Sequence, residues 1–172
     1  SSDNGGVDYY NTVDNRPLKG GKLSHFEGGI RVPYFIKYPG VIPAGKTYDY
    51  PVSNLDIFAT ALAVSGLKLQ DNREIDGVNL VPYVTGKNPA RPHEALFWRN
   101  GFSKAVRKGD WKLYVNERNN VKFLYDLSKD QSETTDLSKA NPEKFKELQE
   151  DLKNWEKKLL DPKWAARSST LL

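Results

Sequence analysis

Two short segments near the start of the chain carry residue types that can bind ions. Asp3 and Asn4 place a carboxylate beside a side-chain amide, directly before two glycines. Oxygen ligands of this kind suit a hard cation such as Ca²⁺, and glycines let the backbone turn sharply beside it. Lys22 also follows two glycines, and an ammonium group on a glycine-rich loop suits an anion. Taken alone, the first segment is also typical of an Asx turn and the second of a solvated lysine.

Two further residues are candidates for contacting a substrate. His25 follows Lys22 by three residues and could face the same pocket, although a single loop histidine is more often a hydrogen-bonded structural residue. Arg99 ends an expected strand, and its guanidinium could form a bidentate pair with a second anionic group on the substrate. A solvent-facing strand arginine is the alternative. We interpret Glu27 and Arg31, in Glu-Gly-Gly-Ile-Arg, as scaffold residues, because arginine can pin a loop to carbonyls or a carboxylate.

The pattern of motifs resembles the sulfatase family of the alkaline-phosphatase superfamily, the formylglycine-dependent and calcium-containing hydrolases of sulfate esters. The resemblance covers nearly the whole chain in the family's order. It rests on the following segments: 2–6, 18–22, 26–33, 52–58, 75–80, 105–113 and 124–127.

The resemblance implies roles for the candidate residues. Asp3 and Asn4 would be two of the calcium ligands, and Lys22 would contact the sulfate group. Arg99 ends a strand where related enzymes bring substrate-recognition side chains toward the pocket, whereas the family's catalytic histidines lie upstream and do not correspond to His25. The remaining calcium ligands and the formylglycine, which the family makes from a Cys/Ser-x-Pro-x-Arg motif, would lie in an upstream portion.

No residue of this chain can supply that nucleophile. The chain has no cysteine, and none of its serines has a proline two positions later. We therefore expect the carboxy-terminal fragment of a carbohydrate or aryl sulfatase, inactive alone. Its partners would be the missing amino-terminal portion and a sulfated carbohydrate or aryl sulfate.

Composition favours a folded protein and excludes some classes. Of the 172 residues, 38% are hydrophobic and 12% aromatic, which argues against a disordered chain. Without cysteine there are no disulfides or thiolate metal sites. No apolar run approaches the length of a membrane span. The net charge of +4 is spread along the sequence, a mild bias toward anionic partners without the basic helix or aromatic interleaving of a nucleic-acid-binding protein.

Hydrophobic patterns predict an α/β fold. An apolar run at 32–38 predicts a buried strand, and Ser53 with Asp56 three residues on predicts a capping-box-like helix start. Leu55, Phe58, Ala59 and Leu62 would form that helix's apolar face. A turn-rich connector at 66–93 should lead into a second unit.

The second unit should hold a small antiparallel sheet and a long helix. Four strands are predicted, at 95–99, 103–107, 111–115 and 122–127, because turn-type clusters separate them. A helix should begin at Asn141-Pro142, lie across the sheet, and stop at Asp161-Pro162, before a surface tail. We therefore expect residues 1–93 to be the carboxy-terminal part of a large alkaline-phosphatase-like sulfatase domain, and residues 94–172 to be a small subdomain.

Two alternative functions stay open. One is a phosphate or phosphonate monoester hydrolase of the same superfamily. The other is a non-catalytic glycan-binding or structural subdomain. A periplasmic or extracellular location is expected, or a lysosomal or other secretory one in a eukaryote.

Overall fold

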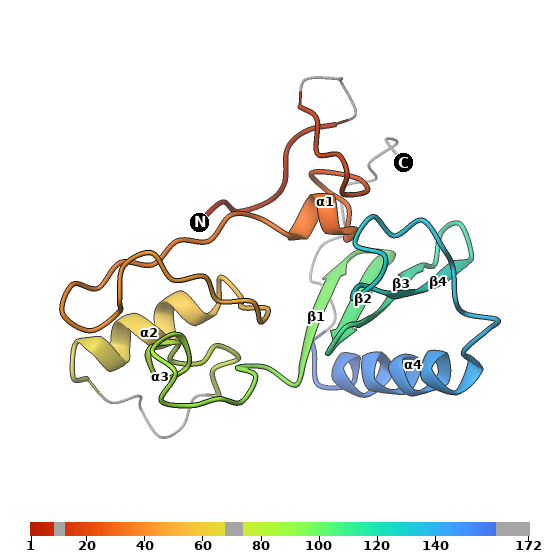
Figure 1. Cartoon of the computed structure of the whole chain (residues 1–172). Coiled ribbons are helices and arrows are strands. Elements are labelled where there is room, and N and C mark those ends of the chain that lie inside the picture. Colours follow the sequence, from red (N-terminus) through yellow and green to blue (C-terminus); the bar gives the residue numbers. More distant parts are fainter. Residues whose placement is uncertain (9–12, 68–73, 161–172) are drawn as a thin grey trace. The chain divides into compact units, whose positions relative to one another are not determined.

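The computed structural model describes residues 1–8, 13–67 and 74–160. Two compact units make up the fold (Figure 1). One unit comprises Ser1 with Tyr34–Glu94, and the other comprises Ser2–Pro33 with the chain from Ala95 onward. The first residues therefore group with the sheet. Whether residues 1–93 belong to one large domain of a longer protein stays a prediction.

The second unit contains the predicted four-stranded antiparallel sheet, in the order β1-β2-β3-β4. Its strands are β1 (Ala95–Asn100), β2 (Ser103–Lys108), β3 (Trp111–Asn116) and β4 (Val121–Asp126). The turns between them contain residues with positive φ, namely Gly101, Gly109 and Asn120. These residue types adopt that conformation most readily, which explains why the strand boundaries lie within one residue of the predicted ones.

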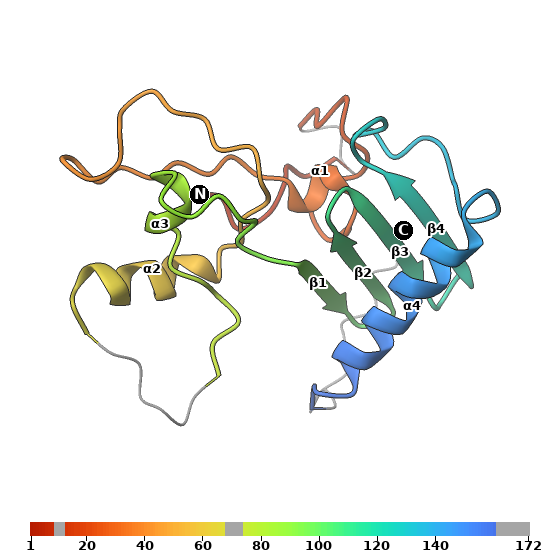
Figure 2. The same cartoon turned by 60° about the horizontal axis from the view of Figure 1, so that its bottom comes forward.

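The long helix α4 (Pro142–Glu156) covers one face of this sheet (Figure 2). Leu148 and Leu152 of α4 are buried against Leu113 and other apolar side chains of the inner strands. Phe97 of β1 stacks on Trp155, with ring centroids 5.1 Å apart. The predicted placement of the helix across the sheet is therefore confirmed. α4 ends at Glu156, earlier than the predicted stop at Asp161-Pro162, and the expected tail lies outside the described residues.

The opposite face of the sheet packs against the short helix α1 (Glu27–Ile30) and its flanking loops. Strand residues alternate between faces, so Lys112 and Tyr114 point away from α4. Phe26, which precedes α1, stacks on Tyr114 with ring centroids 4.2 Å apart. The amino-terminal loops are thereby held on this second face.

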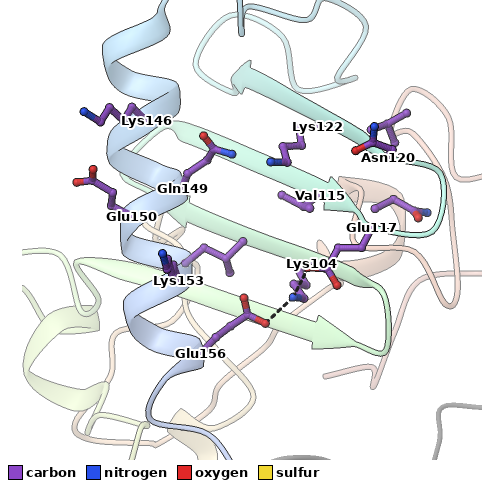
Figure 3. A pocket seen from close by; sticks show the side chains of 13 residues that line it. Lys104, Val115, Glu117, Asn120, Lys122, Lys146, Gln149, Glu150, Lys153 and Glu156 are labelled. Carbon is purple, nitrogen blue, oxygen red and sulfur yellow. Dashed lines mark hydrogen bonds and ion pairs between the residues drawn. The ribbon is translucent and has the colours of Figure 1, made fainter.

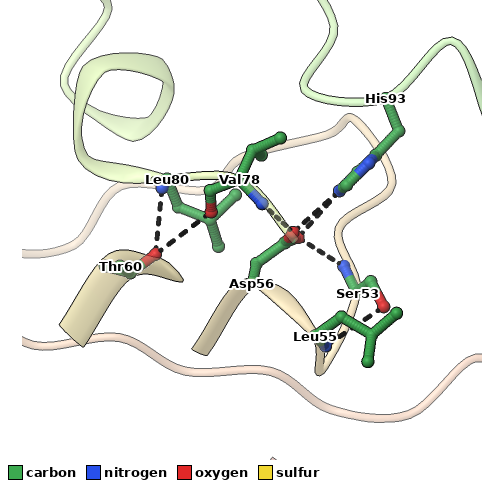
Figure 4. Close-up of polar contacts among 7 residues, drawn as sticks. All are labelled: Ser53, Leu55, Asp56, Thr60, Val78, Leu80 and His93. Atoms are coloured by element: carbon green, nitrogen blue, oxygen red, sulfur yellow. Dashed lines mark hydrogen bonds and ion pairs between the residues drawn. The ribbon is translucent and has the colours of Figure 1, made fainter. Parts of the chain in front are cut away.

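The first unit contains α2 (Asp56–Val64) and α3 (Val81–Val84). The capping-box-like start is present only in part. The Ser53 amide donates to Asp56 Oδ2 at 2.7 Å and the Ser53 hydroxyl accepts from the Leu55 amide, but the N-cap residue is Leu55, whose side chain makes no capping bond (Figure 4). Of the predicted apolar face of α2, only Ala59 is buried within the described chain, whereas Leu55 and Phe58 are exposed.

The strand predicted at residues 32–38 is wrong. No strand forms in this segment, and no described residue pairs with its backbone in a ladder. A strand needs a neighbour to accept and donate its backbone hydrogen bonds, and an apolar run alone does not supply one. Among the helices of the described ranges, none has the length and apolar character needed to cross a membrane.

Candidate functional site

The loops that carry the predicted ion-binding residues are joined by backbone hydrogen bonds in the second unit. The amide of Lys22 donates to the carbonyl of Gly6 at 2.9 Å. The amide of Gly5 donates to the carbonyl of Gly29, at the end of α1, at 2.8 Å. The backbone next to Asn4 is thus fixed both to the lysine loop and to α1.

Glycines permit this close approach. An added Cβ at Gly5 would lie 1.7 Å from the carbonyl oxygen of Gly28. An added Cβ at Gly28 would lie 2.1 Å from the carbonyl oxygen of Gly20. Both distances are impossible for a real side chain, so three loops that are distant in sequence can meet only because these positions have none.

Asn15 adds a side-chain link between the same loops. Its Oδ1 accepts from the Gly6 amide at 3.1 Å, and its Nδ2 donates to the carbonyls of Gly6 and Gly20 at 3.0 and 3.2 Å. The sequence analysis missed this residue, because an asparagine in a polar loop carries no pattern that distinguishes it from a turn residue.

The predicted metal ligands offer oxygens but not a complete site. Asp3 is exposed, and its Oδ1 accepts from the Asn4 amide at 3.0 Å. The Asn4 side chain donates from Nδ2 to the Gly5 carbonyl, and its Oδ1 accepts no hydrogen bond from any described residue. A carboxylate and an amide oxygen suit a hard cation, but such an ion takes six or more oxygens. The described residues hold no group of three or more potential acidic, histidine or cysteine ligands. The two side chains therefore fit calcium as part of a larger ligand set.

Lys22 is half-buried, and its Nζ makes no hydrogen bond or ion pair with any residue in the described part of the chain. Its backbone, by contrast, is fixed through Gly6. A cation on a fixed backbone, without a partner among the described residues, can meet an external anion.

His25 lies beneath this loop rather than open to solvent. Its Nδ1 is 3.2 Å from the Ser103 hydroxyl at the start of β2, and the residue is 8% exposed. Burial, aided by the positive charge of Lys112, lowers the pKa of His25 to about 4. The imidazole is therefore neutral at neutral pH, and a substrate contact by His25 stays a prediction.

A buried group of charges lies between α1 and the sheet. Lys112 Nζ lies 2.8 Å from Glu27 Oε1 and 2.8 Å from Glu133 Oε1. A second oxygen of Glu133 accepts from the Glu27 amide at 2.6 Å. Arg107 Nη1 is 3.6 Å from Glu27 Oε2. The scaffold interpretation of Glu27 is consistent with this geometry, since its carboxylate anchors α1 to β2 and β3.

Glu133 is the second buried acid of this group, and burial of its carboxylate is unfavourable. Burial raises the pKa of Glu133, although Lys112 and the Glu27 amide act in the opposite direction. Its backbone has φ of 54°, an uncommon value for a residue with a side chain. Sequence reasoning missed both Lys112 and Glu133. The one available signal was a lysine between Trp111 and Leu113 in an otherwise apolar strand.

Arg99 is not brought together with the other candidates. Its Nη2 donates to the Leu160 carbonyl at 3.2 Å, and Nη1 is 3.8 Å from Glu156 of α4. It therefore lies on the α4 face of the sheet, whereas Lys112 and His25 lie on the α1 face. Its predicted contact with substrate stays a prediction.

Comparisons with known proteins show the family to which the chain is similar. A family model described as "N-sulphoglucosamine sulphohydrolase, C-terminal" matches residues 21–161. The human steryl-sulfatase is 34% identical over 166 residues, covering 78% of this chain and 28% of that protein. A sulfatase of Formosa agariphila is 33% identical over 158 residues, covering 82% of this chain and 28% of that protein.

A solved structure is similar over almost the whole chain. The crystal structure of Ps i-CgsB in complex with k-i-k-neocarrahexaose superimposes with a TM-score of 0.83 at 31% identity. The match covers 97% of this chain and 38% of that one. The chain thus spans well under half the length of these similar proteins.

Proposed function

Because this chain belongs to the sulfatase family, through its carboxy-terminal domain, we propose that the protein containing it hydrolyses sulfate esters. The observation that carries the proposal is the 2.9 Å hydrogen bond from the Lys22 amide to the Gly6 carbonyl, which joins the lysine loop to the Asp3-Asn4 loop. The Asp3-Asn4 loop would bind a cation and the Lys22 loop an anion. With the two loops joined, the cation and the lysine could hold one sulfate group together.

Each candidate residue then has a defined task. Asp3 and Asn4 would supply two oxygens to a calcium ion, which when bound would neutralise charge on the sulfate oxygens. Lys22 would bind and orient the sulfate and stabilise the negative charge that develops on it. The nucleophile is not among the residues of this chain, which contains no Cys/Ser-x-Pro-x-Arg motif.

The proposed substrate class is a sulfated carbohydrate. Support comes from the similar protein Ps i-CgsB, whose structure contains k-i-k-neocarrahexaose. The similarity to human steryl-sulfatase favours small sulfate esters as well. We propose a periplasmic, extracellular or other secretory location, as suits an enzyme acting on such glycans.

The test compares an aryl sulfate with the matching aryl phosphate, using the whole protein that contains this chain. We expect the sulfate to be turned over much faster. Lys22→Ala should lower kcat/KM for the sulfate by about 10²-fold or more, as the loss of one preorganised charge typically does. Lys46→Ala is the matched control, because Lys46 also follows a glycine but is exposed to solvent. Faster turnover of the phosphate would instead favour the phosphate monoester hydrolase.

The calcium proposal has a separate readout. Asp3→Ala should reduce bound calcium, measured by elemental analysis after dialysis, and raise the calcium concentration needed for half-maximal activity. Asp49→Ala, which removes another exposed aspartate, should change neither. Unchanged calcium content in the Asp3 variant would exclude Asp3 from the ligand set.

A further inference from the structure

A groove with a volume of about 550 Å³ lies between α4 and strands β2, β3 and β4, within the second unit (Figure 3). We propose that this groove binds a further part of an anionic oligosaccharide whose sulfate is held at the Lys22 loop. This inference rests on the proposed sulfatase function and adds a second binding surface on the other face of the sheet.

Some charged side chains of the groove already form ion pairs within the protein, and others do not. Lys104 is already paired, at 2.6 Å from Glu117 and 2.7 Å from Glu156. One lysine does not balance two carboxylates, but Glu156 also lies 3.8 Å from Arg99 Nη1, so two cations face the two acids and little net negative field is left for a ligand. The paired end of the groove is therefore close to neutral.

Three further lysines line the groove, namely Lys122, Lys146 and Lys153. None of them forms an ion pair with a residue of the described ranges, and each is exposed. Glu150 is the remaining acid of the lining. The groove thus presents three available cations against one available anion, which favours an anionic ligand.

Uncharged side chains of the groove could make the hydrogen bonds and apolar contacts by which proteins bind a sugar ring. In Figure 3 the side chains of Lys122 and Gln149 point toward each other across the groove, whereas Lys146 and Glu150 extend from α4 toward its outer side. Val115 and Leu152 contribute apolar lining. Cations and an amide beside an apolar floor match a sugar ring with anionic substituents.

The position of the groove connects it to the candidate site. Ser103, Asn116 and Val121 are register partners in one row, at the same end of the sheet. Ser103 contacts His25 on the α1 face. Asn116 and Val121 line the groove. The loop that carries Lys22 and His25 therefore meets the sheet at the same end as the groove, and the proposed oligosaccharide would pass from one face to the other around this end.

This arrangement distinguishes long substrates from short ones. An aryl sulfate would occupy only the site that binds the sulfate, whereas the proposal requires an oligosaccharide to contact both surfaces. The lysines of the groove should therefore affect affinity for the longer ligand and leave turnover of the shorter one unaltered.

The experiment uses the whole protein and two probes, a carrageenan hexasaccharide and a heparin-derived hexasaccharide, in calorimetric titrations at several salt concentrations. The triple variant Lys122→Ala, Lys146→Ala, Lys153→Ala should weaken binding of at least one probe about tenfold, since each exposed charge pair contributes a fraction of a kcal/mol. The dependence of affinity on salt should also become shallower. Turnover of an aryl sulfate should stay within about twofold of the original.

A matched control removes the same charge elsewhere on this unit. Lys139, Lys157 and Lys158 are exposed and do not line the groove, so the triple alanine variant at these positions should bind the hexasaccharides almost normally. Equal weakening in both triple variants, or no binding of either probe by the original protein, would overturn the groove proposal. A selective loss of binding in a protein that turns over no aryl sulfate would instead support the groove and reject the proposed function.

The single variant Lys122→Glu guards against a loss of folding in the triple variant. It should weaken hexasaccharide binding while leaving the thermal unfolding temperature unchanged, because Lys122 is exposed and has no partner in the described chain. Unchanged affinity in this variant would contradict the groove as the binding surface.

Discussion

The ammonium nitrogen of Lys112 lies 2.8 Å from a carboxylate oxygen of Glu27, where neither side chain exposes more than 2% of its surface. This pair joins β3 to α1, and α1 in turn accepts the backbone hydrogen bond from Gly5. The small sheet therefore does more than follow the candidate site in sequence. It fixes α1, to which the Asp3-Asn4 loop is hydrogen-bonded through Gly5.

Removing the lysine should be costly. Lys112→Met keeps the length of the side chain but leaves Glu27 and Glu133 buried without their cation, so the free energy of unfolding should fall by about 3–5 kcal/mol. Denaturant unfolding of the whole protein measures this, with Lys139→Met as the exposed control. A loss below about 1 kcal/mol would show that the two acids find other partners or bind a proton at little cost.

Local signals explain what the sequence predicted correctly. The turns at Gly101 and Gly109 separate strands that pair with their immediate neighbours in sequence, so each hairpin is specified within 14 residues, at 95–108 and 103–116. The capping contact between Ser53 and Asp56 spans only three residues. Such short-range patterns can be read without knowing the rest of the fold.

Long-range partners explain what the sequence did not reveal. Lys112 and Glu27 are 85 positions apart, and the amide of Glu27 meets Glu133 across 106. No local pattern encodes such pairings. The prediction of a strand at residues 32–38 was wrong for a related reason. A strand needs a hydrogen-bonded neighbour, and an apolar run does not identify that neighbour. Arg99 was named from its place at a strand end. Alternation along the strand places it on the α4 face, and its contact with substrate stays a prediction.

The stability of the protein should depend on pH through His25. Its pKa is lowered to about 4, first by burial and then by the charge of Lys112, whereas an unfolded histidine titrates near 6.5. Between these values the unfolded chain binds more protons than the folded one. Stability from this residue is therefore complete above about pH 6.5 and falls by about 3 kcal/mol as the pH drops toward 4.

A variant without the titrating group isolates this effect. His25→Gln retains a polar side chain that can bond to Ser103, and its unfolding free energy should change less between pH 7 and pH 4.5 than that of the original protein. Unfolding at the two pH values, in the same buffer ions, gives the comparison. Parallel pH curves for both proteins would mean that His25 is protonated in the folded state.

Asp56 should be essential to the first unit. Its fully buried carboxylate accepts hydrogen bonds from the amides of Ser53 and Val78 and lies 2.9 and 3.0 Å from His93 Nε2 (Figure 4). Burial acts to raise the pKa of Asp56, but these hydrogen bonds outweigh it, so the pKa is lowered. The stability that the carboxylate contributes is present above the ordinary pKa of an aspartate and is lost as the pH falls through the lowered value.

Asp56→Asn tests this role with almost no change in shape. An amide nitrogen would face at least one of the backbone donors, so the variant should lose about 2–3 kcal/mol of unfolding free energy. Asp76→Asn, at an exposed position of the same unit, should be nearly neutral. If both variants unfold at the same denaturant concentration, the carboxylate network does not stabilise the unit.

The close approach at Gly28 gives a prediction that joins the fold to activity. A methyl group there would lie 2.1 Å from the Gly20 carbonyl oxygen and 2.6 Å from that of Lys19, so Gly28→Ala must push the lysine loop away from α1. Because the same loop bonds to Gly6, the displacement should separate Lys22 from the Asp3-Asn4 loop. Turnover of an aryl sulfate should then fall by at least about tenfold, as small misplacements of binding groups typically cause.

A second glycine separates steric displacement from a general loss of stability. Gly40 has φ of 79° and no neighbouring atom within 4 Å of an added Cβ, so Gly40→Ala should cost about 1 kcal/mol through backbone strain alone. Comparing the two variants at a temperature where both remain folded assigns any difference in activity to the position of the lysine loop. Full activity in Gly28→Ala would show that Lys22 acts independently of the contact between this loop and α1.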